Sequence, residues 1–323
     1  LKRAKLYVNQ AKEDRILMVN NILFDATKTY FNWLMAFNEK NVYEDFLDNA
    51  AIRFNGIKKN YEVGENPAID TLEARITVTT RKLEFEKARI KYIKSSLELS
   101  NYLWLNNDTP IEIKENIIPD IKTFETVDAY YDTLLMDLEA FNLDNHPKLQ
   151  SLNYKYKSLV IDKRLQMNTL LPKIDLQYNF LSETPEIARS FSTSAYKSGF
   201  NISIPLFLRK ERGNLNLAKI KLQNTEFEIQ ATRVSLKNKI DGISQELQSY
   251  LVQNEFTTTM VSDYETMLTA EERKLFLGES SLFLVKSRES KFRDAKLKAI
   301  SLENKFLVTK ASLVNTLSID NIE

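Results

Sequence analysis

Residues 172–180 read Pro-Lys-Ile-Asp-Leu-Gln-Tyr-Asn-Phe, and residues 199–206 read Gly-Phe-Asn-Ile-Ser-Ile-Pro-Leu. In both stretches apolar and polar side chains alternate, which places the apolar ones on one face of a β-strand. Residues 182–198 between them are rich in Ser and Thr and contain Pro185, so we expect an exposed loop. The pattern predicts a β-hairpin. Because an isolated hairpin is not stable in water, this one must pair with further strands.

The composition indicates a chain with few turns and no strong electrostatic field. The 323 residues include only 6 Gly and 7 Pro, and the formal net charge is +1. A nearly neutral chain gives no sign of a nucleic-acid partner. The absence of Cys excludes disulfides, thiolate metal sites and a Cys nucleophile. No apolar run is long enough for a transmembrane helix.

Long helices are expected before the strands. Residues 1–60 contain no Pro and interleave charged with apolar residues, as in an amphipathic helix. A break follows at residues 61–67, where Gly64 suits a helix end and Pro67 a helix start. The next helix is predicted from about Ala68 to Trp104, and its apolar positions are Leu72, Ile76, Leu83, Ala88, Ile90, Ile93 and Leu97.

Residues 105–145 are less regular, with breakers at 106–110 and at Pro119 and a short helix predicted over 127–141. His146, the only histidine, precedes Pro147 and is interpreted as a helix-start residue rather than a metal ligand or catalytic group. That helix should run to Leu171 and lead into the first strand.

After Pro205 the chain contains no proline to its end. Apolar residues recur every seven positions in this part, which is typical of helices that supercoil left-handedly. They are Leu215, Leu222, Ile229, Leu236, Ile243 and Tyr250, with the small residues Ala218, Thr225 and Thr232 beside them. A helix from about 208 to 275 would be about 100 Å long. After a break at residues 276–281, a return helix repeats the spacing at Phe292, Ala299, Phe306 and Leu313.

The two halves of the chain form an internal repeat. Leu1–Lys5 aligns with Leu215–Lys219, and the same offset of 214 aligns Gly64-Glu65 with Gly278-Glu279. Each copy is predicted to be a long helical hairpin with a Gly-Glu tip. The second copy follows a β-hairpin, so we expect a matching hairpin to precede the first copy in a longer protein.

At this point the sequence resembles the TolC family of outer-membrane efflux proteins. The resemblance rests on a set of short stretches that run in the family's order along nearly the whole chain. They are Val63-Gly64-Glu65 with Asp70, Glu73, Ala74 and Arg75; His146-Pro147-Lys148-Leu149; Leu171-Pro172; Pro205-Leu206-Phe207 with Gly213 and Ala218; and Phe276-Leu277-Gly278-Glu279-Ser280-Ser281-Leu282.

The resemblance implies a mainly α fold with a β-hairpin, in which long antiparallel helical hairpins of a homotrimer form an α-barrel tunnel across the periplasm. The tunnel would join a transmembrane β-barrel in the outer membrane of a Gram-negative bacterium, with four strands expected per subunit and two present here. A closed sheet leaves no backbone edge in hydrocarbon. The expected segments are a first helical hairpin at 1–104, an equatorial region at 105–145, a connecting helix at 146–171, the strand hairpin at 172–206, a second helical hairpin at 207–317 and a C-terminal end at 318–323.

The implied function is a passive export duct that serves tripartite efflux or type I secretion. Its partners would be outer-membrane lipid, a periplasmic adaptor protein and an inner-membrane transporter that supplies the energy. Alternation predicts a lipid-facing set: Ile174, Leu176, Tyr178, Phe180, Phe200, Ile202 and Ile204. The family's adaptor-docking tips correspond here to Val63, Gly64, Glu65, Leu277, Gly278 and Glu279.

One departure concerns the periplasmic entrance. Well-known members carry carboxylates six and nine positions after the second-repeat glycine, where this chain has Leu284 and Ser287. The first repeat keeps acids at Asp70 and Glu73, which share a helix face, so any acidic constriction would rest on them. The alternative is that these two carboxylates simply face water.

No catalytic triad, phosphate-binding loop or metal-ligand cluster stands out, so we expect no enzyme activity, cofactor or metal. The competing class is a coiled-coil scaffold protein without a pore, which would carry the same seven-residue stripes. Cell fractionation separates the two: the duct belongs in the outer membrane, and the scaffold is soluble.

Overall fold

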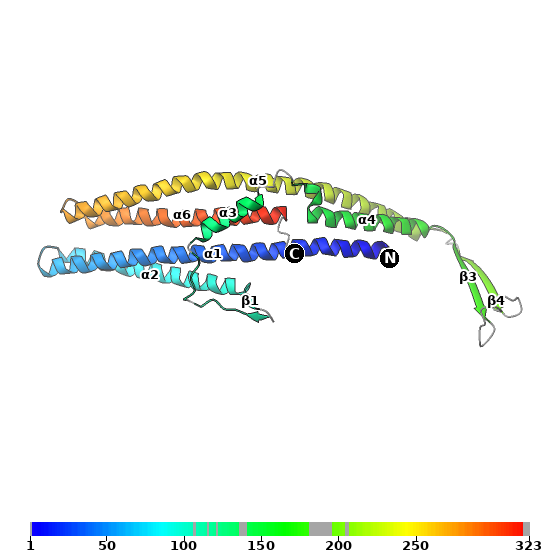
Figure 1. Cartoon of the computed structure of the whole chain (residues 1–323), viewed down its shortest axis with the longest axis horizontal. Helices are drawn as coiled ribbons and strands as arrows, with labels where there is room; N and C mark the ends of the chain where they lie inside the picture. Colours follow the sequence, from blue (N-terminus) through cyan, green and yellow to red (C-terminus); the bar gives the residue numbers. More distant parts are fainter. Residues whose placement is uncertain are drawn as a thin grey trace. The chain divides into compact units, whose positions relative to one another are not determined.

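The structure, a computed structural model, describes residues 2–105, 108–114, 116–120, 122–135, 141–180, 196–203 and 207–318. Four long helices dominate these ranges, and two short strand pairs accompany them (Figure 1). In chain order the elements are α1 (Lys2–Glu62), α2 (Ala68–Ser100), β1 (Trp104–Leu105), β2 (Thr109–Pro110), α3 (Thr123–Leu135), the 3-10 helix η2 (Leu143–Asn145), α4 (Pro147–Asn168), β3 (Lys173–Phe180), β4 (Tyr196–Ser203), α5 (Arg209–Phe276) and α6 (Leu282–Leu317). The prediction of a mainly α fold with a β-hairpin is therefore confirmed.

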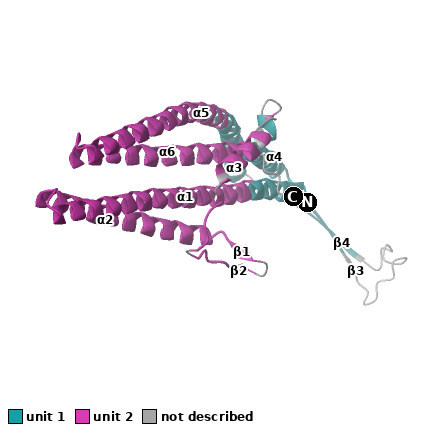
Figure 2. Ribbon diagram, turned by 60° about the vertical axis from the view of Figure 1, so that its left-hand side comes forward, with its two compact units in different colours: residues 1–16, 143–235 teal, residues 17–142, 236–323 magenta. Residues whose placement is uncertain are grey.

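The chain divides into two compact units (Figure 2). Unit 1 comprises residues 1–16 and 143–235, and unit 2 comprises residues 17–142 and 236–323. The helices α1 and α5 contribute residues to both units.

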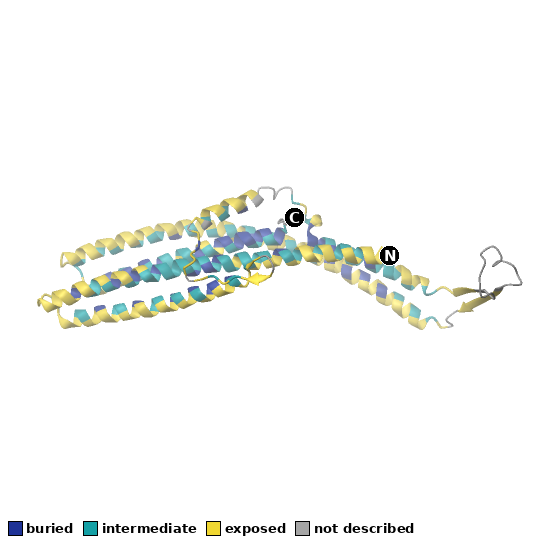
Figure 3. Ribbon diagram, turned by 60° about the horizontal axis from the view of Figure 1, so that its bottom comes forward, coloured by how far each residue is buried: buried dark blue, intermediate teal, exposed yellow. Residues whose placement is uncertain are grey.

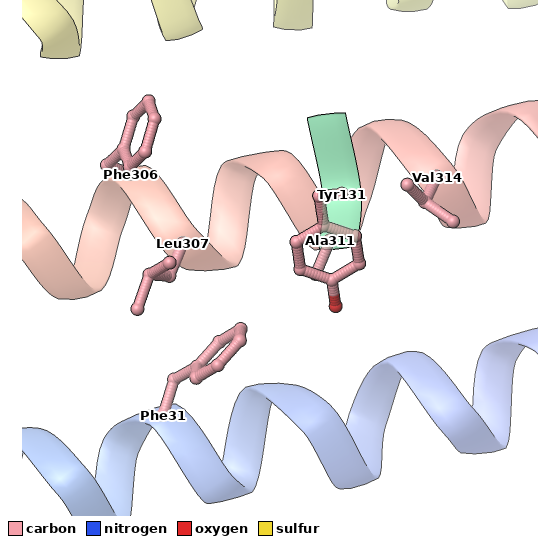
Figure 4. Close-up of a cluster of buried hydrophobic side chains, with 6 residues drawn as sticks. All are labelled: Phe31, Tyr131, Phe306, Leu307, Ala311 and Val314. Atoms are coloured by element: carbon pink, nitrogen blue, oxygen red, sulfur yellow. The ribbon is translucent and has the colours of Figure 1, made fainter. Parts of the chain in front are cut away.

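Unit 2 contains α2, α3 and α6 together with residues 17–62 of α1 and 236–276 of α5, so both hairpin tips belong to it (Figure 2). Its core lies between the two hairpins. In its main cluster Phe31 of α1 meets Phe306 and Leu307 of α6, and Tyr131 of α3 completes the cluster with Ala311 and Val314 (Figure 4). Lys310 of α6 is also buried, and its Nζ pairs with Asp128 and Asp132 of α3. Apolar burial and these ion pairs together hold α3 on α6.

Two further clusters in unit 2 join helices that are distant in sequence. Trp33 of α1 stacks on Tyr92 of α2 at 6.3 Å between ring centroids, and its Nε1 donates to Ser96 Oγ at 2.8 Å. Phe46 of α1 packs edge-on against Phe292 of α6 at 5.8 Å, with Val261, Tyr264 and Leu268 of α5 nearby. The first helical hairpin is therefore packed against the second along α1.

The seven-residue stripe of α5 is its buried face, as the sequence predicted. Leu222, Ile229 and Ile243 are buried, and Leu236 is half-buried. The helix α2 differs, because one buried stripe consists of the small or charged residues Ala74, Arg81, Ala88 and Ser95, and large apolar residues are buried only towards its end, at Tyr92 and Leu99.

Unit 1 holds α4 between the start of α1 and the first part of α5. Polar contacts join the helices: Arg3 to Asp162 at 3.5 Å, Ser151 Oγ to Asp14 at 2.6 Å, and Lys155 to Glu228 at 2.8 Å. His146 caps α4, since its Nδ1 accepts from the Lys148 N–H at 3.1 Å. Its interpretation as a helix-start residue is confirmed.

The strands β3 and β4 pair antiparallel in a register that opposes apolar to apolar residues. Ile174 faces Ile202 and Leu176 faces Phe200, whereas Asp175 faces Asn201. All the side chains of this pair that the structure describes are exposed (Figure 3).

Several element boundaries differ from the predictions. The helix expected to run to Trp104 ends at Ser100, because Trp104–Leu105 pairs with Thr109–Pro110 and Ser100 Oγ accepts from the Ile113 N–H. The helix expected over 127–141 is α3, which starts earlier because Phe124 packs on Phe306.

Two differences concern the ends of α4 and of the predicted loop. The helix α4 ends at Asn168 rather than Leu171. The loop predicted over 182–198 is shorter, since residues 196–198 belong to β4 and continue its pairing with β3. The rest of that loop, Ile204 and residues 319–323 lie outside the described residues, as does the side chain of Phe180. Across the described ranges, no helix has the length and apolar character needed to cross a membrane.

Candidate functional site

The two helical tips have the same backbone geometry. At the first, Gly64 N–H donates to the Tyr61 carbonyl at 3.0 Å and Glu65 N–H to the Asn60 carbonyl at 2.8 Å. At the second, Gly278 N–H donates to Leu275 at 3.0 Å and Glu279 N–H to Lys274 at 2.8 Å. Each pair of bonds is the Schellman cap that ends a helix on a left-handed residue. Every bond recurs at the offset of 214, which supports the internal repeat found in the sequence.

Both tip glycines are required by backbone conformation rather than by packing within the chain. Their φ angles are +83° at Gly64 and +79° at Gly278, a region that glycine adopts without strain. A Cβ built on either glycine would meet no atom within 4 Å. The space beside each glycine is therefore open to another molecule.

Large apolar side chains surround the tips and are exposed. Val63 is 73% exposed, and Leu277, Phe276 and Phe283 are 59%, 90% and 74% exposed. Clustered apolar side chains at a surface are typical of protein interaction sites. Glu65 and Glu279, the last of the predicted tip residues, are exposed beside them.

Side-chain contacts distinguish the second tip from the first. Ser280 Oγ donates to Glu271 Oε1 at 2.5 Å, and Arg288 lies 3.7 Å from the same carboxylate. The hydrogen bond from Ser280 and the nearby cations Lys274 and Arg288 lower the pKa of Glu271. At the first tip, Asn66 Nδ2 donates to Asp70 at 3.3 Å, and Lys58 pairs with Glu62 of the same helix at 4.0 Å.

The two carboxylates of the predicted constriction have different surroundings. Asp70 accepts the local bond from Asn66 and is half-buried. Glu73 is exposed and lines a small cavity of about 170 Å³ together with Arg53, Lys286 and Phe283. Both acids lie in the first turns of α2, so they share one end of this helix. Their role as a constriction remains a prediction.

A buried ion-pair cluster in unit 2 was not anticipated from the sequence. Glu289 of α6 is 1% exposed and accepts from Arg53 of α1 at 2.5 Å and from Arg81 of α2 at 3.3 Å. Arg81 also binds Glu84, which in turn binds Arg293 of α6 at 3.0 Å. The sequence signal was available, because Arg81 interrupts a seven-residue stripe of small residues in α2.

The strand pair of unit 1 presents an apolar face and a polar face. The described members of the predicted lipid-facing set share one face and are 40–82% exposed: Ile174, Leu176, Tyr178, Phe200 and Ile202. The other face carries Asp175, Gln177 and Asn201. None of the residues that the structure describes covers this apolar face.

Apolar stripes also remain exposed on two of the long helices. On α2, Ile76, Leu83, Ile90 and Leu97 recur every seven residues and are 45–57% exposed. On α5, Ile220, Phe227 and Val234 repeat the same spacing at 54–63% exposure. Seven-residue apolar stripes are the surfaces by which helices pack in coiled coils.

Comparison with known protein families identifies the class of protein. The model of the outer membrane efflux protein family matches residues 142–318, which is more than half of the chain. The chain therefore belongs to the outer membrane efflux protein family, and the resemblance to TolC-like proteins is confirmed. Membership in this family locates the protein in the outer membrane.

The fold is that of solved outer-membrane channels. The Campylobacter jejuni CmeC channel matches with a TM-score of 0.76 and 14% identity, over 98% of this chain and 66% of that one. Vibrio cholerae VceC matches with a TM-score of 0.76 and 12% identity, over 98% of this chain and 74% of the VceC chain. The open state of the Neisseria gonorrhoeae MtrE channel matches with a TM-score of 0.73 and 13% identity, over 98% of this chain and 70% of the MtrE chain. Comparison with curated protein sequences gave no significant match.

These matches also show how much of a channel the chain represents. It spans about two thirds of the length of the CmeC channel. The described strands number four, of which only β3 and β4 carry the alternation of a membrane strand.

Proposed function

We propose that this chain is part of a passive export duct that crosses the outer membrane and extends into the periplasm. The observation that carries the proposal is the pair β3 and β4, in which one face is apolar and exposed and the other is polar. Strands that alternate in this way suit a barrel with lipid outside and water inside. Family membership supports the same function.

The duct is a homotrimer in this proposal. Two membrane strands cannot close a sheet, and even three copies supply six, fewer than the smallest usual barrel of about eight. Further strands from the longer protein would complete a shared barrel. The exposed stripes on α2 and α5 support subunit contacts, because each offers an apolar seam with no partner among the described residues.

The helical tips dock a periplasmic adaptor, and an inner-membrane transporter supplies the energy for efflux or type I secretion. The open space beside Gly64 and Gly278 and the exposed Val63 and Leu277 support this role. Asp70 and Glu73, near the first tip, are proposed to form the acidic part of the entrance.

Site-specific crosslinking in cells tests the function, and residues 1–323 contribute no native Cys to the background. Single Cys residues at Val63 or Leu277 in the full-length protein should crosslink to an adaptor, whereas Cys at the exposed Lys239 in mid-α5 should not. The protein should fractionate with the outer membrane as trimers, and cells that lack it should lose export. A soluble protein, or a monodisperse monomer from intact protein in detergent, would contradict the proposal and favour the scaffold.

A further inference from the structure

The ends of helices and strands meet in unit 1 at a junction that is rich in positive charge. The helix α4 ends at Asn168, five residues before β3 begins, and α5 begins six residues after β4 ends. Five to six extended residues reach at most about 20 Å, which limits the distance from each helix end to its strand end. The register brings Lys173, at the start of β3, opposite Ser203, at the end of β4.

Six basic residues lie at this junction, and Glu211 is the only acidic residue in residues 163–173 and 207–213. We call this group the basic junction: Lys163, Arg164, Lys173, Arg209, Lys210 and Arg212. All are exposed except Lys163, which is half-buried. The chain as a whole has a net charge of only +1, so the concentration of charge is local.

Among the residues that the structure describes, the basic junction has no acidic partner. No ion pair joins any of the six to a described residue; the nearby Asp162 is paired with Arg3 instead. Arg209 lies over the ring of Phe207 at 5.9 Å, a contact that leaves its guanidinium free to bind an anion. Like charges repel one another, so a cluster of this kind is stabilised by external anions.

Exposed apolar side chains accompany these charges. Leu165, Met167, Leu171 and Phe207 are 50–78% exposed. Basic side chains combined with exposed apolar ones are typical of segments that lie at the boundary between lipid headgroups and acyl chains. Long basic side chains suit this position, because their stems cover apolar surface while the charge reaches the phosphate.

We propose that the basic junction binds the headgroups of anionic phospholipids in the periplasmic leaflet of the outer membrane. The inference rests on the proposed function, since it requires that β3 and β4 enter the membrane and that the helices remain in the periplasm. It adds a lipid-binding surface that anchors the duct at a fixed depth. The recognised groups are phosphates, and the attraction is largest for lipids with net negative charge.

Native mass spectrometry of full-length trimers in detergent tests the proposal. Trimers titrated with phosphatidylglycerol should retain it in preference to phosphatidylcholine, and salt should weaken the retention. The triple variant R209Q, K210Q and R212Q should lower the apparent affinity for phosphatidylglycerol by at least about tenfold. A second triple variant, K163Q, R164Q and K173Q, should act in the same direction.

A matched control removes three positive charges further along α5, at the exposed Lys221, Lys237 and Lys239, and should retain phosphatidylglycerol like the wild type. Equal retention of the two lipids by the wild type, or unchanged retention in both junction variants, would overturn the proposal. Export and outer-membrane fractionation are measured on the same proteins. Normal export without lipid preference rejects only the basic junction, whereas a wild type that neither exports nor reaches the outer membrane rejects the duct itself.

Discussion

At the first tip the chain reverses through Gly64, and at the second through Gly278, with backbone hydrogen bonds that correspond one to one. The side chains around the two turns differ. The α6 helix after Gly278 is capped by Ser281 Oγ, and Ser280 binds Glu271 of α5. The α2 helix after Gly64 has Pro67 at its cap, without a side-chain bond. The repeat thus keeps the turn itself. A side-chain bond beside the turn reaches back to the preceding helix at the second tip, from Ser280 to Glu271, whereas the Asn66–Asp70 bond at the first tip stays on the α2 side.

The largest expected effect lies where the two hairpins join. Replacing Glu289 by Ala leaves Arg81, which is 4% exposed, without a carboxylate from α6. Removing one partner of a buried ion pair should cost about 3–5 kcal/mol of unfolding free energy. Urea unfolding measures the loss. The control is Glu272→Ala, because that side chain is 46% exposed and its pair with Arg53 should contribute within about 1 kcal/mol. Equal losses in the two variants would contradict the importance of the buried cluster.

Substitution of the tip glycines tests whether the two turns require a left-handed residue to the same extent. Replacing Gly64 or Gly278 by Ala should lower the unfolding free energy by about 1–2 kcal/mol in either case, because an L-residue is strained at these φ angles. Asn is tolerated in such caps, so Gly278→Asn should leave trimers intact. If an adaptor approaches the backbone closely, Gly278→Asn still abolishes export and crosslinking at the tip. Normal crosslinking and export by Gly278→Asn trimers would show that Gly278 only ends the helix.

The side-chain cap of α6, formed by Ser281, should produce a smaller difference in stability between the two hairpins. Ser281→Ala removes the bond to the Leu284 N–H and should cost about 1 kcal/mol. Pro67→Ala at the matching cap of α2 removes no side-chain bond, so it serves as the control. Thermal unfolding of both variants measures the difference. A cost at Pro67 as large as that at Ser281 would show that the cap bond contributes nothing.

Acid should loosen the second tip only slightly and leave the first unchanged. The pKa of Glu271 is lowered in the folded state, so its contribution is present above the ordinary value of about 4.5 and is lost as the pH falls through the lowered pKa. Spin labels at positions 63 and 277 report tip mobility by electron paramagnetic resonance between pH 7 and pH 3. Only the label at 277 should become more mobile, and Glu271→Gln should remove this response. Equal responses at both tips would refute the assignment.

Much of this architecture could be predicted from local patterns. The recurrence of Gly64 as Gly278, 214 positions later, predicted the two tips. The alternation of apolar and polar residues predicted the apolar face of β3 and β4. The chain has two kinds of apolar stripe, however, and spacing alone does not say which one is buried. Leu222 lies on a buried stripe, whereas Leu83 lies on an exposed one. That distinction depends on the packing of distant helices.

The missed features depend on contacts between residues far apart in the sequence. Arg81 and Glu289 are 208 positions apart, and no local pattern connects them. The start of α3 likewise depends on the contact of Phe124 with Phe306. The end of α2 is different, because it depends on the nearby pairing of β1 with β2. A tertiary contact overrode local propensity at the start of α3.

The central claim is that β3 and β4 cross the outer membrane with their apolar face toward lipid, and Arg substitutions at neighbouring positions test it directly. The amount of folded, outer-membrane-embedded trimer is measured for Leu176→Arg and for Gln177→Arg in the full-length protein. Leu176, which is 82% exposed in this chain, should face lipid, so Arg there should cost about 2–4 kcal/mol near the bilayer midplane and reduce assembly. Arg at Gln177, on the polar face, should be tolerated. Equal assembly of the two variants would contradict the claim.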